Sequence, residues 1–379
     1  MGKYNPLEII RERHILITLL TLLLMMNLIS CNSDESYYSA DDFGKVPKID
    51  AHFHYLSFDN TYMKYAISQN FRLITPIWEG EEVPIDVQFR LSDSIQSMFP
   101  EHYAFFASFP TDSINSEGFA EKTIEHIRSS LESGAAGVKI WKNIGMVLKY
   151  PDGRFIMVDD PVFDPVFKFL EDNNIPVIAH LGEPKDCWLP FDEMTDPGDV
   201  SYYRNNPQYH MYYHTEVPSY EKQIEARDNL LMKHPKLDFT GAHLGSLEWS
   251  VDELAKRLEN FPKMKVDLAA RMYHLQYQSG RDYDHVRNFI IKYQDRIVYG
   301  TDSEVNDLPG AEAAAITERL GKGWKANWMY LATDSVINNT RGLKLPSTVI
   351  DKIYFNNSKR VFSSVRLWPL RELPTLYTH

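Results

Sequence analysis

The feature that most constrains the fold is an alternation of short β-rich runs with helical patterns, which starts at Lys48 and continues to the end of the chain. The β-rich runs are Lys48–His54, Phe71–Ile77, His102–Phe109, Ala136–Trp141, Pro176–His180, Leu237–His243, Met264–Ala269 and Ile297–Thr301. Strands that alternate with helices form parallel sheets. Eight units of about 30 residues each favour a (β/α)8 TIM barrel, an α/β fold, over a doubly wound sheet.

The helical patterns between these runs have the spacing of one buried face. Ile124, Ile127 and Leu131 follow one another at i, i+3 and i+7, the period of an amphipathic helix. Residues 173–176 and 234–235 carry the Asn and Pro signals that end a helix before the next strand. The sequence predicts helices at Phe119–Leu131, Pro165–Asp172, Tyr220–His234, Val251–Glu259 and Asp284–Tyr293.

Length and composition agree with one folded domain. A chain of 379 residues, 44% of them hydrophobic, has room for up to about three domains, but no linker or internal repeat interrupts residues 48–362. We therefore predict a single domain over 48–379, in which the long loop 183–218, rich in Tyr, Asp, Asn and Pro, is functional. The excess of 52 acidic over 40 basic residues argues against a nucleic-acid partner.

The first residues carry a targeting signal. Lys3, Arg11 and Arg13 precede an apolar run from Ile15 to Ile29, which is short for a bilayer span of about 20 residues and typical of a secretory signal. The run ends in Leu28-Ile29-Ser30-Cys31, which resembles the lipobox of bacterial lipoproteins. The resemblance implies a signal peptide over residues 1–30, acylation of Cys31 and attachment to the membrane of the cell envelope by lipid alone. An uncleaved anchor and a plain signal peptide are the alternatives.

The segment after Cys31 is polar and acidic, and we expect residues 31–47 to tether the domain. Ser33-Asp34-Glu35 is similar to the acidic export tags of some Bacteroidetes surface lipoproteins, which leaves both the periplasm and the cell surface open. The two cysteines form no disulfide framework, and we expect Cys187 to be a small buried hydrophobe.

Two histidines stand at the end of the first predicted strand. Because side chains alternate along a strand, His52 and His54 should both face the barrel interior, with Asp50 one layer deeper. Two imidazoles at this spacing make half of a metal site, since Zn²⁺ favours about four ligands of the histidine and carboxylate types. Structural histidines are the alternative for this pair taken alone.

Further polar residues fall at the ends of later strands. His180 ends the fifth run, His243 the sixth and Asp302 follows the eighth, while Lys139 lies in the fourth. The intervals between them fit whole β/α units, with the long loop 183–218 added between two of the histidines. All of them therefore belong to the carboxyl face of the barrel, where active sites of this fold are built. A metal site is the prediction.

These residues stand in motifs that resemble a known family. Residues 49–54 (IDAHFH), 176–183 (PVIAHLGE), 240–245 (TGAHLG) and 298–302 (VYGTD) are similar to the amidohydrolase-related branch of the metal-dependent TIM-barrel hydrolases. Residues 353–362 (IYFNNSKRVF) resemble the terminal helix of that branch. The resemblance implies that His52, His54, His180 and Asp302 hold one divalent ion. His243 would be a second-sphere acid/base or, with two metals, a ligand.

The chemistry of such a set is hydrolytic. Bound Zn²⁺ lowers the pKa of its water from roughly 15.7 to about 7. Asp302 can take the proton of that water and pass it to the leaving group, and a free His243 can polarise the substrate carbonyl. Asp302 as a helix cap and His243 as a core histidine are the structural alternatives.

Lys139 and the substrate contacts are less constrained. In some relatives the corresponding lysine is carbamylated and bridges two metals; we favour one Zn²⁺, with Lys139 a substrate contact or a structural cation paired with a carboxylate such as Asp50. Strand alternation should let only one of Lys139 and Lys142 face inward. Arg271 after the seventh strand suits a substrate carboxylate. Trp188 and Arg204 of the long loop are further candidates for substrate contacts, and loop aromatics such as these could pack on a ring or sugar face.

Three functions remain open on the sequence. The first is a metal-dependent hydrolase of a small ester, lactone or amide that releases a carboxylate. The second is a non-oxidative decarboxylase of a carboxylated ring, because the branch that the motifs resemble contains such enzymes. The third is an inactive lipoprotein that keeps the barrel as a ligand-binding surface. A small-molecule substrate is expected throughout, and the resemblance allows a homodimer.

Overall fold

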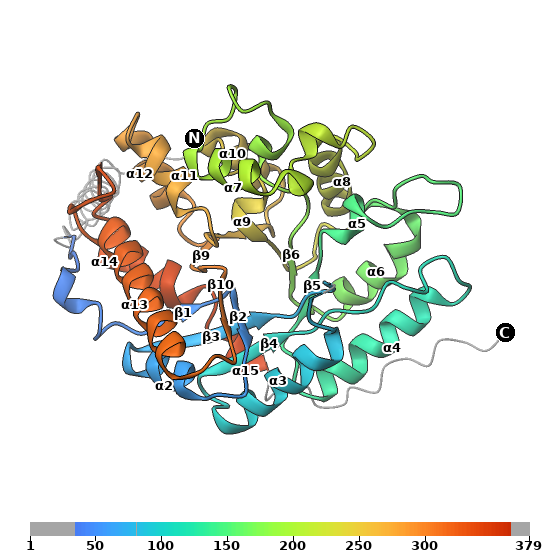
Figure 1. Ribbon diagram of the computed structural model, residues 1–379, viewed down its shortest axis with the longest axis horizontal. Helices are drawn as coiled ribbons and strands as arrows, with labels where there is room; N and C mark the ends of the chain where they lie inside the picture. Colours follow the sequence, from blue (N-terminus) through green and yellow to red (C-terminus); the bar gives the residue numbers. More distant parts are fainter. Residues whose placement is uncertain (1–34, 81, 365–379) are drawn as a thin grey trace, which may run out of the picture. The chain divides into compact units, whose positions relative to one another are not determined.

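The computed structural model describes residues 35–80 and 82–364 (Figure 1). The predicted signal peptide and Cys31 lie outside the described residues. From Tyr37 onward the described residues form one compact unit, and the elements of the fold belong to it. Among the helices of the described ranges, none combines the length and apolar character that crossing a bilayer would take.

The barrel consists of parallel strands that pair in chain order. Within the described residues these are β1 (Lys48–Asp50), β3 (Phe71–Pro76), β4 (Tyr103–Phe106), β5 (Val138–Ile140), β6 (Val177–Ala179), β7 (Phe239–Gly241), β8 (Lys265–Asp267) and β9 (Ile297–Val298). A bridge between Ala107 and Val138 joins β4 to β5. The Ala51 amide donates to the Tyr299 carbonyl at 3.0 Å and links β9 back to β1. Each strand lies within a predicted run, so the predicted barrel is confirmed.

Helices pack around the outside of these strands, as Figure 1 shows for α2, α3, α4 and α6. The helices are α2 (Thr61–Ser68), α3 (Ile85–Met98), α4 (Phe119–Glu132), α5 (Asn143–Met146), α6 (Asp164–Asp172), α7 (Pro197–Asn205), α8 (Tyr220–Lys233), α9 (Ala242–Gly245), α10 (Val251–Asn260), α11 (Met272–Ser279), α12 (Tyr283–Lys292), α13 (Gly310–Ala332), α14 (Ser347–Asp351) and α15 (Arg360–Ser364). The five helices predicted from apolar spacing correspond to α4, α6, α8, α10 and α12, to within one residue at either end.

The apolar core has two layers. Most buried side chains lie between the strands and the outer helices in one continuous cluster. A smaller cluster joins the barrel strands to α15 and contains Ile49, Ile74, Phe106, Ile178, Val298, Val361 and Phe362. The polar residues of the carboxyl face therefore lie on a tightly packed base that holds their backbones in place.

A bend at Ala51 and His52 changes which side chains of the first strand face inward. Ile49 belongs to the inner cluster, whereas the Asp50 carboxylate accepts hydrogen bonds from Trp324 Nε1 (2.9 Å) on α13 and from Thr301 Oγ1 (2.6 Å). The prediction that Asp50 lies in the barrel one layer below His52 is therefore wrong. Strict alternation holds only along an uninterrupted strand, and the chain bends between β1 and β2 (Phe53–Leu56).

The predicted tether is shorter than residues 31–47. From Tyr38 onward the chain packs on the barrel, where the Tyr38 hydroxyl donates to Asp351 Oδ1 at 2.8 Å. Phe43 and Val46 are buried, and their carbonyls accept hydrogen bonds from the buried Lys48 ammonium. Buried apolar residues and hydrogen bonds such as that from Trp328 Nε1 to the Ser39 carbonyl (2.9 Å) together attach this largely polar segment to the domain.

The segment predicted as a long loop, residues 183–218, folds into short helical elements. These are η3 (Lys185–Trp188), α7, η4 (Pro207–Tyr209) and η5 (Met211–Tyr213). Asp186 organises the segment, because its Oδ2 accepts the backbone N–H groups of Thr195 (2.7 Å) and Asp196 (2.8 Å). Cys187 is buried, as predicted.

Candidate metal centre

His52 is fixed by a carboxylate from β8, the strand next but one to β1 around the barrel. Its Nδ1 lies 2.8 Å from Asp267 Oδ2 at the end of β8. The other oxygen of Asp267 accepts the backbone N–H groups of His243 (2.7 Å) and Ala269 (3.1 Å). Although burial opposes ionisation, His52 and these donors lower the pKa of Asp267. An ionised Asp267 holds the proton of His52 on Nδ1, which leaves the lone pair of Nε2 facing the site.

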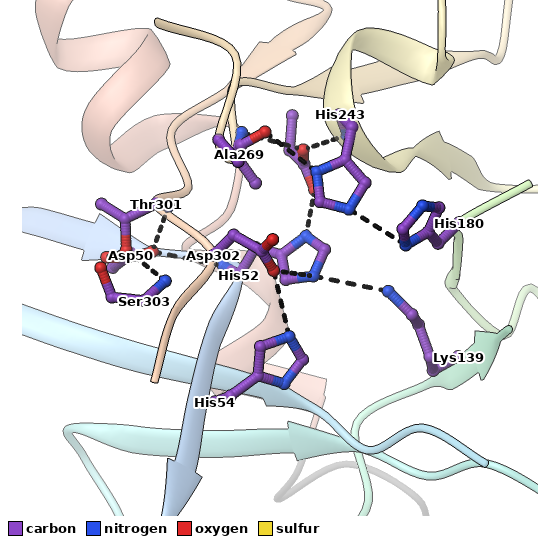
Figure 2. A network of polar contacts seen from close by, with 12 residues as sticks. Asp50, His52, His54, Lys139, His180, His243, Ala269, Thr301, Asp302 and Ser303 are labelled. Atoms are coloured by element: carbon purple, nitrogen blue, oxygen red, sulfur yellow. Dashed lines mark hydrogen bonds and ion pairs between the residues drawn. The ribbon is translucent and has the colours of Figure 1, made fainter. Parts of the chain in front are cut away.

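His54 and His52 both meet Asp302. His54 Nε2 lies 3.1 Å and His52 Nε2 3.3 Å from Asp302 Oδ1 (Figure 2). The two chain segments are aligned by a parallel pairing of β2 with β10 (Ser303–Asn306) just beyond the barrel. The Asp302 amide also donates to the His52 carbonyl at 2.8 Å. Asp302 adopts a φ of 61°, an uncommon value for a non-glycine residue.

His243 and His180 form the other half of the cluster. His243 Nε2 lies 3.1 Å from His180 Nδ1, and His243 Nδ1 lies 2.9 Å from the Ala269 carbonyl (Figure 2). The carbonyl can only accept, so it places the proton of His243 on Nδ1. His243 has a φ of 58° and follows directly after β7. Strained backbone of this kind clusters at functional sites, and here it occurs at both predicted catalytic residues.

The protonation states in the cluster are those of metal ligands. Burial, together with Lys142 and Lys139, lowers the pKa of His180 well below the usual range. Burial and His180 do the same to the pKa of His243. Although burial opposes its ionisation, His243 and His52 hold the pKa of Asp302 well below the usual range. Neutral imidazoles and an ionised carboxylate are what a divalent cation requires.

The donor atoms converge closely enough to share one cation. One donor atom each of His52, His243 and Asp302 lie within 4.8 Å of one another. His54 Nε2 and His180 Nδ1 adjoin this group at 3.1 Å from Asp302 and His243. Two neutral imidazole nitrogens that face each other need a shared proton or a shared cation between them. The residues therefore fit the divalent ion that the sequence implies.

Both predicted lysines lie at the site, which corrects the expectation that only one would face inward. Lys139 Nζ lies 3.4 Å from His52 Nε2, and burial lowers its pKa to about 8. Lys142 pairs with Glu183, whose other oxygen lies 3.8 Å from His180 Nε2. Lys142 follows the end of β5, so strand alternation does not apply to it. The suggested pairing of Lys139 with Asp50 is wrong, because Asp50 contacts α13 instead.

The three other predicted substrate contacts lie in different places. Arg271 precedes α11, and its Nη1 donates to the Ala270 carbonyl at 3.0 Å. Among the described residues Arg271 forms no ion pair within 4 Å, and its buried Nε has no hydrogen-bond partner. Trp188 packs on Tyr220, with ring centroids 5.7 Å apart. Arg204 is exposed and lies over the Phe191 ring at 5.2 Å, so the structure does not bring it to the histidines.

Two tryptophans and one carboxylate at the site were missed by sequence reasoning. The Trp78 ring lies 4.5 Å from His54 and the Trp141 ring 5.0 Å from His180, while their own centroids are 6.3 Å apart. Trp141 ends the fourth predicted run, and Asp267 lies in the seventh, so strand-end position was an available signal for both. A cavity of about 460 Å³ also opens on Asp302 and is lined by Tyr273, Ser303 and other residues.

The fold and the site together define the class of protein. It is an eight-stranded parallel barrel with histidines and an aspartate at the carboxyl ends of its strands. The family model of the amidohydrolases matches residues 97–363, and the chain belongs to this family. It is therefore an enzyme of the amidohydrolase superfamily. No curated protein matches the sequence significantly.

Solved structures similar to this chain share the fold at low sequence identity. A protein described as amidohydrolase II has 15% identity and a TM-score of 0.50, over 83% of this chain and 99% of that one. An uncharacterised TIM-barrel protein from Bordetella bronchiseptica has 15% identity and a TM-score of 0.49, over 85% and 100%. A 2,6-dihydroxybenzoate decarboxylase from Rhizobium has 13% identity and a TM-score of 0.47, over 84% and 99%.

Proposed function

We propose that the protein is a metal-dependent hydrolase that cleaves a small ester, lactone or amide and releases a carboxylate. The observation that carries the proposal is the convergence of five side chains: His52, His54, His180, His243 and Asp302. In addition, hydrogen-bond acceptors hold the ring protons of His52 and His243 on Nδ1. A single Zn²⁺ is the cation we propose, because imidazole and carboxylate ligands suit it. When bound, it would supply Lewis acidity and lower the pKa of a water molecule.

Asp302 and His243 carry the proton chemistry in this proposal. Asp302 is the general base: its carboxylate is ionised and its side chain is 31% exposed, so water can reach it. It accepts the proton of the attacking water and returns it to the leaving group. His243 is held neutral with its proton on Nδ1, so its Nε2 carries a lone pair beside His180. This nitrogen can accept a hydrogen bond but cannot donate one to a substrate carbonyl, so the expected polarising role is replaced by orientation of a donor group. Each acid/base role of this type contributes about 10²–10⁴-fold in rate.

Arg271 would bind a carboxylate of the substrate. Its guanidinium is near enough to His180 and His243 to influence the pKa values of both. Glu248, Asp199 and Glu183 surround it and, against the effect of burial, raise its pKa, so it stays charged. A partly buried guanidinium without an ion pair among the described residues is suited to a bidentate carboxylate.

Decarboxylation of a carboxylated ring is the second candidate. The observation that favours it is the pair of tryptophans beside His54 and His180, because indole faces pack well on a flat ring. Asp302 would then first take a proton from a water molecule or a hydroxyl of the ring and pass it to the ring carbon as the bond to the departing carbon dioxide breaks. The two reactions differ in whether an oxygen atom from water enters the product.

The test is turnover of substrate panels in water enriched in ¹⁸O, followed by mass spectrometry of the products. The zinc-loaded enzyme should incorporate one ¹⁸O atom per ester, lactone or amide cleaved. Asp302→Asn and His243→Gln should each lower kcat/KM by about 10²-fold or more. His285→Gln is the matched control, because His285 is an exposed histidine that pairs with Asp252 at 2.8 Å. Release of carbon dioxide from ring carboxylates without ¹⁸O in the organic product would overturn the hydrolase in favour of the decarboxylase.

We also propose that the enzyme works in the bacterial cell envelope, attached through acylated Cys31. The support is the basic and apolar order of residues 1–30 and the lipobox-like residues 28–31. The tether in this proposal ends before Tyr38, whose hydroxyl donates to Asp351 Oδ1 at 2.8 Å. Its short length would keep the domain close to the membrane surface.

A further inference from the structure

A second cluster of ligand-type side chains lies between the insertion 183–218 and the barrel. It consists of Asp196 and Asp199 at the start of α7 and His274 in α11. One donor atom from each residue lies within 4.8 Å of the others. None of the three belongs to the centre around His52 and Asp302. From this geometry we propose that Asp196, Asp199 and His274 form a second binding site for a divalent cation, Zn²⁺, which fastens the insertion to α11.

The imidazole ring of His274 is buried and lacks hydrogen-bond partners within the described part of the chain. Its side chain is 6% exposed, and neither ring nitrogen has a hydrogen-bond partner among the described residues. Its Nε2 nevertheless lies 3.3 Å from Asp196 Oδ2 and 3.5 Å from Asp199 Oδ2. Asp199 Oδ2 is also buried and has no hydrogen-bond partner among the described residues. Buried polar atoms left unpaired are destabilising, so a ligand that satisfies several at once is favoured.

The separations are those of atoms that share a metal ion. With bonds of about 2.1 Å, two ligands of a tetrahedral Zn²⁺ lie about 3.4 Å apart. The distances from His274 Nε2 to the two carboxylate oxygens are 3.3 and 3.5 Å. A protonated His274 that merely paired with both aspartates would direct its N–H at one of them, yet the contacts do not have hydrogen-bond geometry.

The aspartates have one oxygen each available for the ion. Asp196 Oδ1 accepts the Gly198 amide at 2.7 Å and caps α7, which leaves Oδ2 to face His274. The cap also fixes the carboxylate before a ligand arrives. Two carboxylates neutralise one divalent charge, and an imidazole ligand favours Zn²⁺ over Ca²⁺ or Mg²⁺, which prefer oxygen.

The site would control the insertion beside the catalytic centre. α11 begins directly after Arg271, and Asp199 is one of the groups that raise the pKa of that arginine. A cation that joins Asp199 to His274 therefore holds α7 next to the residue proposed to bind substrate. This second site does not depend on which reaction the enzyme catalyses.

The test is the number of zinc ions that the purified enzyme retains after chelation, reloading and dialysis, measured by mass spectrometry of the metal. His274→Gln and Asp199→Asn should each retain one zinc per chain fewer than the wild type. His285→Gln, a change of the same type at an exposed histidine, should retain the wild-type number. Asp199→Asn decides the result if the buried His274→Gln fails to fold, because the Asp199 side chain is 16% exposed.

Limited proteolysis locates the lost ion. At free zinc about 100 times the dissociation constant, the zinc-free form falls to about one hundredth, so cleavage within residues 183–218 should slow about 100-fold in the wild type. Asp199→Asn should show no such protection beyond that given by the catalytic ion. Equal zinc content and equal protection in wild type and Asp199→Asn would overturn the second site, whether or not the enzyme hydrolyses any substrate.

Discussion

The substitution Asp267→Asn tests whether Asp267 supports metal binding by orienting His52, without itself being a ligand. In the wild type Asp267 Oδ2 faces His52 Nδ1 at 2.8 Å, and Oδ1 accepts two backbone N–H groups. Asparagine keeps one oxygen for the backbone donors, so its NH₂ group must face His52. The new NH₂ group and the Nδ1–H group of His52 would then face each other in a fully buried position. We expect His52 to move its proton to Nε2, the nitrogen that faces Asp302 at 3.3 Å.

The size of the effect follows from the loss of that lone pair. Removing the partner that orients a ligating histidine weakens metal binding by about 10–100-fold, which corresponds to about 1.4–2.7 kcal/mol. If His52 kept its tautomer instead, the unpaired donors would cost about 1–3 kcal/mol of folding stability. The variant should therefore lose zinc affinity with at most a modest loss of stability.

Zinc affinity is measured by competition with a chromogenic chelator, and the His52 tautomer by the ¹⁵N shifts of its ring. Asp282→Asn is the matched control, since Asp282 caps α12 by accepting the His285 amide at 3.1 Å and touches no ring of the cluster. Zinc affinity within twofold of the wild type in a folded Asp267→Asn variant would refute the reasoning. A fall in zinc affinity while the His52 proton stays on Nδ1 would also refute it.

Three further predictions concern other parts of the chain. Gly300→Ala would place a Cβ 2.9 Å from His52 Cβ and 3.3 Å from its backbone nitrogen, so His52 must shift; zinc affinity should fall about tenfold or more in the same chelator assay, and unchanged affinity would contradict the tight packing. Burial lowers the pKa of Lys48 to about 7, so above that pH the unfolded chain holds a proton that the folded chain lacks, and stability rises with pH toward the ordinary lysine pKa of about 10.4. The free energy of urea unfolding should therefore rise less steeply from about pH 7 to about pH 9 in Lys48→Met than in the wild type. Equal slopes in the two proteins would contradict the lowered pKa of Lys48. Cys31→Ser should move the protein from the membrane pellet to the soluble fraction, whereas Cys187→Ser should not; a Cys31 variant that stays in the pellet counts against acylation.

The convergence of the candidate site residues could be predicted from the sequence because it depends on where the strands end. His52, His180 and His243 stand at the ends of strands, and a parallel barrel brings all such ends to one face. The barrel and its helices followed from the same alternation of apolar patterns. None of this required knowledge of which side chains touch.

What escaped prediction depended on local departures from regular geometry. The bend at Ala51 turned Asp50 toward α13, and Lys142 lies past the end of its strand where alternation no longer applies. Asp267 ends its strand, but its role was missed because it depends on a side-chain contact with His52 that the sequence pattern does not show. The contact of His274 with Asp196 joins segments whose pairing is set by the folded insertion, which was expected to be a loop.

The pairing of β2 with β10 has a consequence for the order in which the protein matures. His54 and Asp302 are separated by 248 positions, and all four histidines of the cluster are synthesised before the aspartate. Closing so long a loop is slow, because its entropic cost precedes any contact that compensates it. The complete donor set can therefore form only after the last β/α unit has emerged and β10 has aligned beside β2. If the enzyme binds the cation proposed above, metal selection is a late event of folding, and an incompletely synthesised chain offers the cation only part of the site.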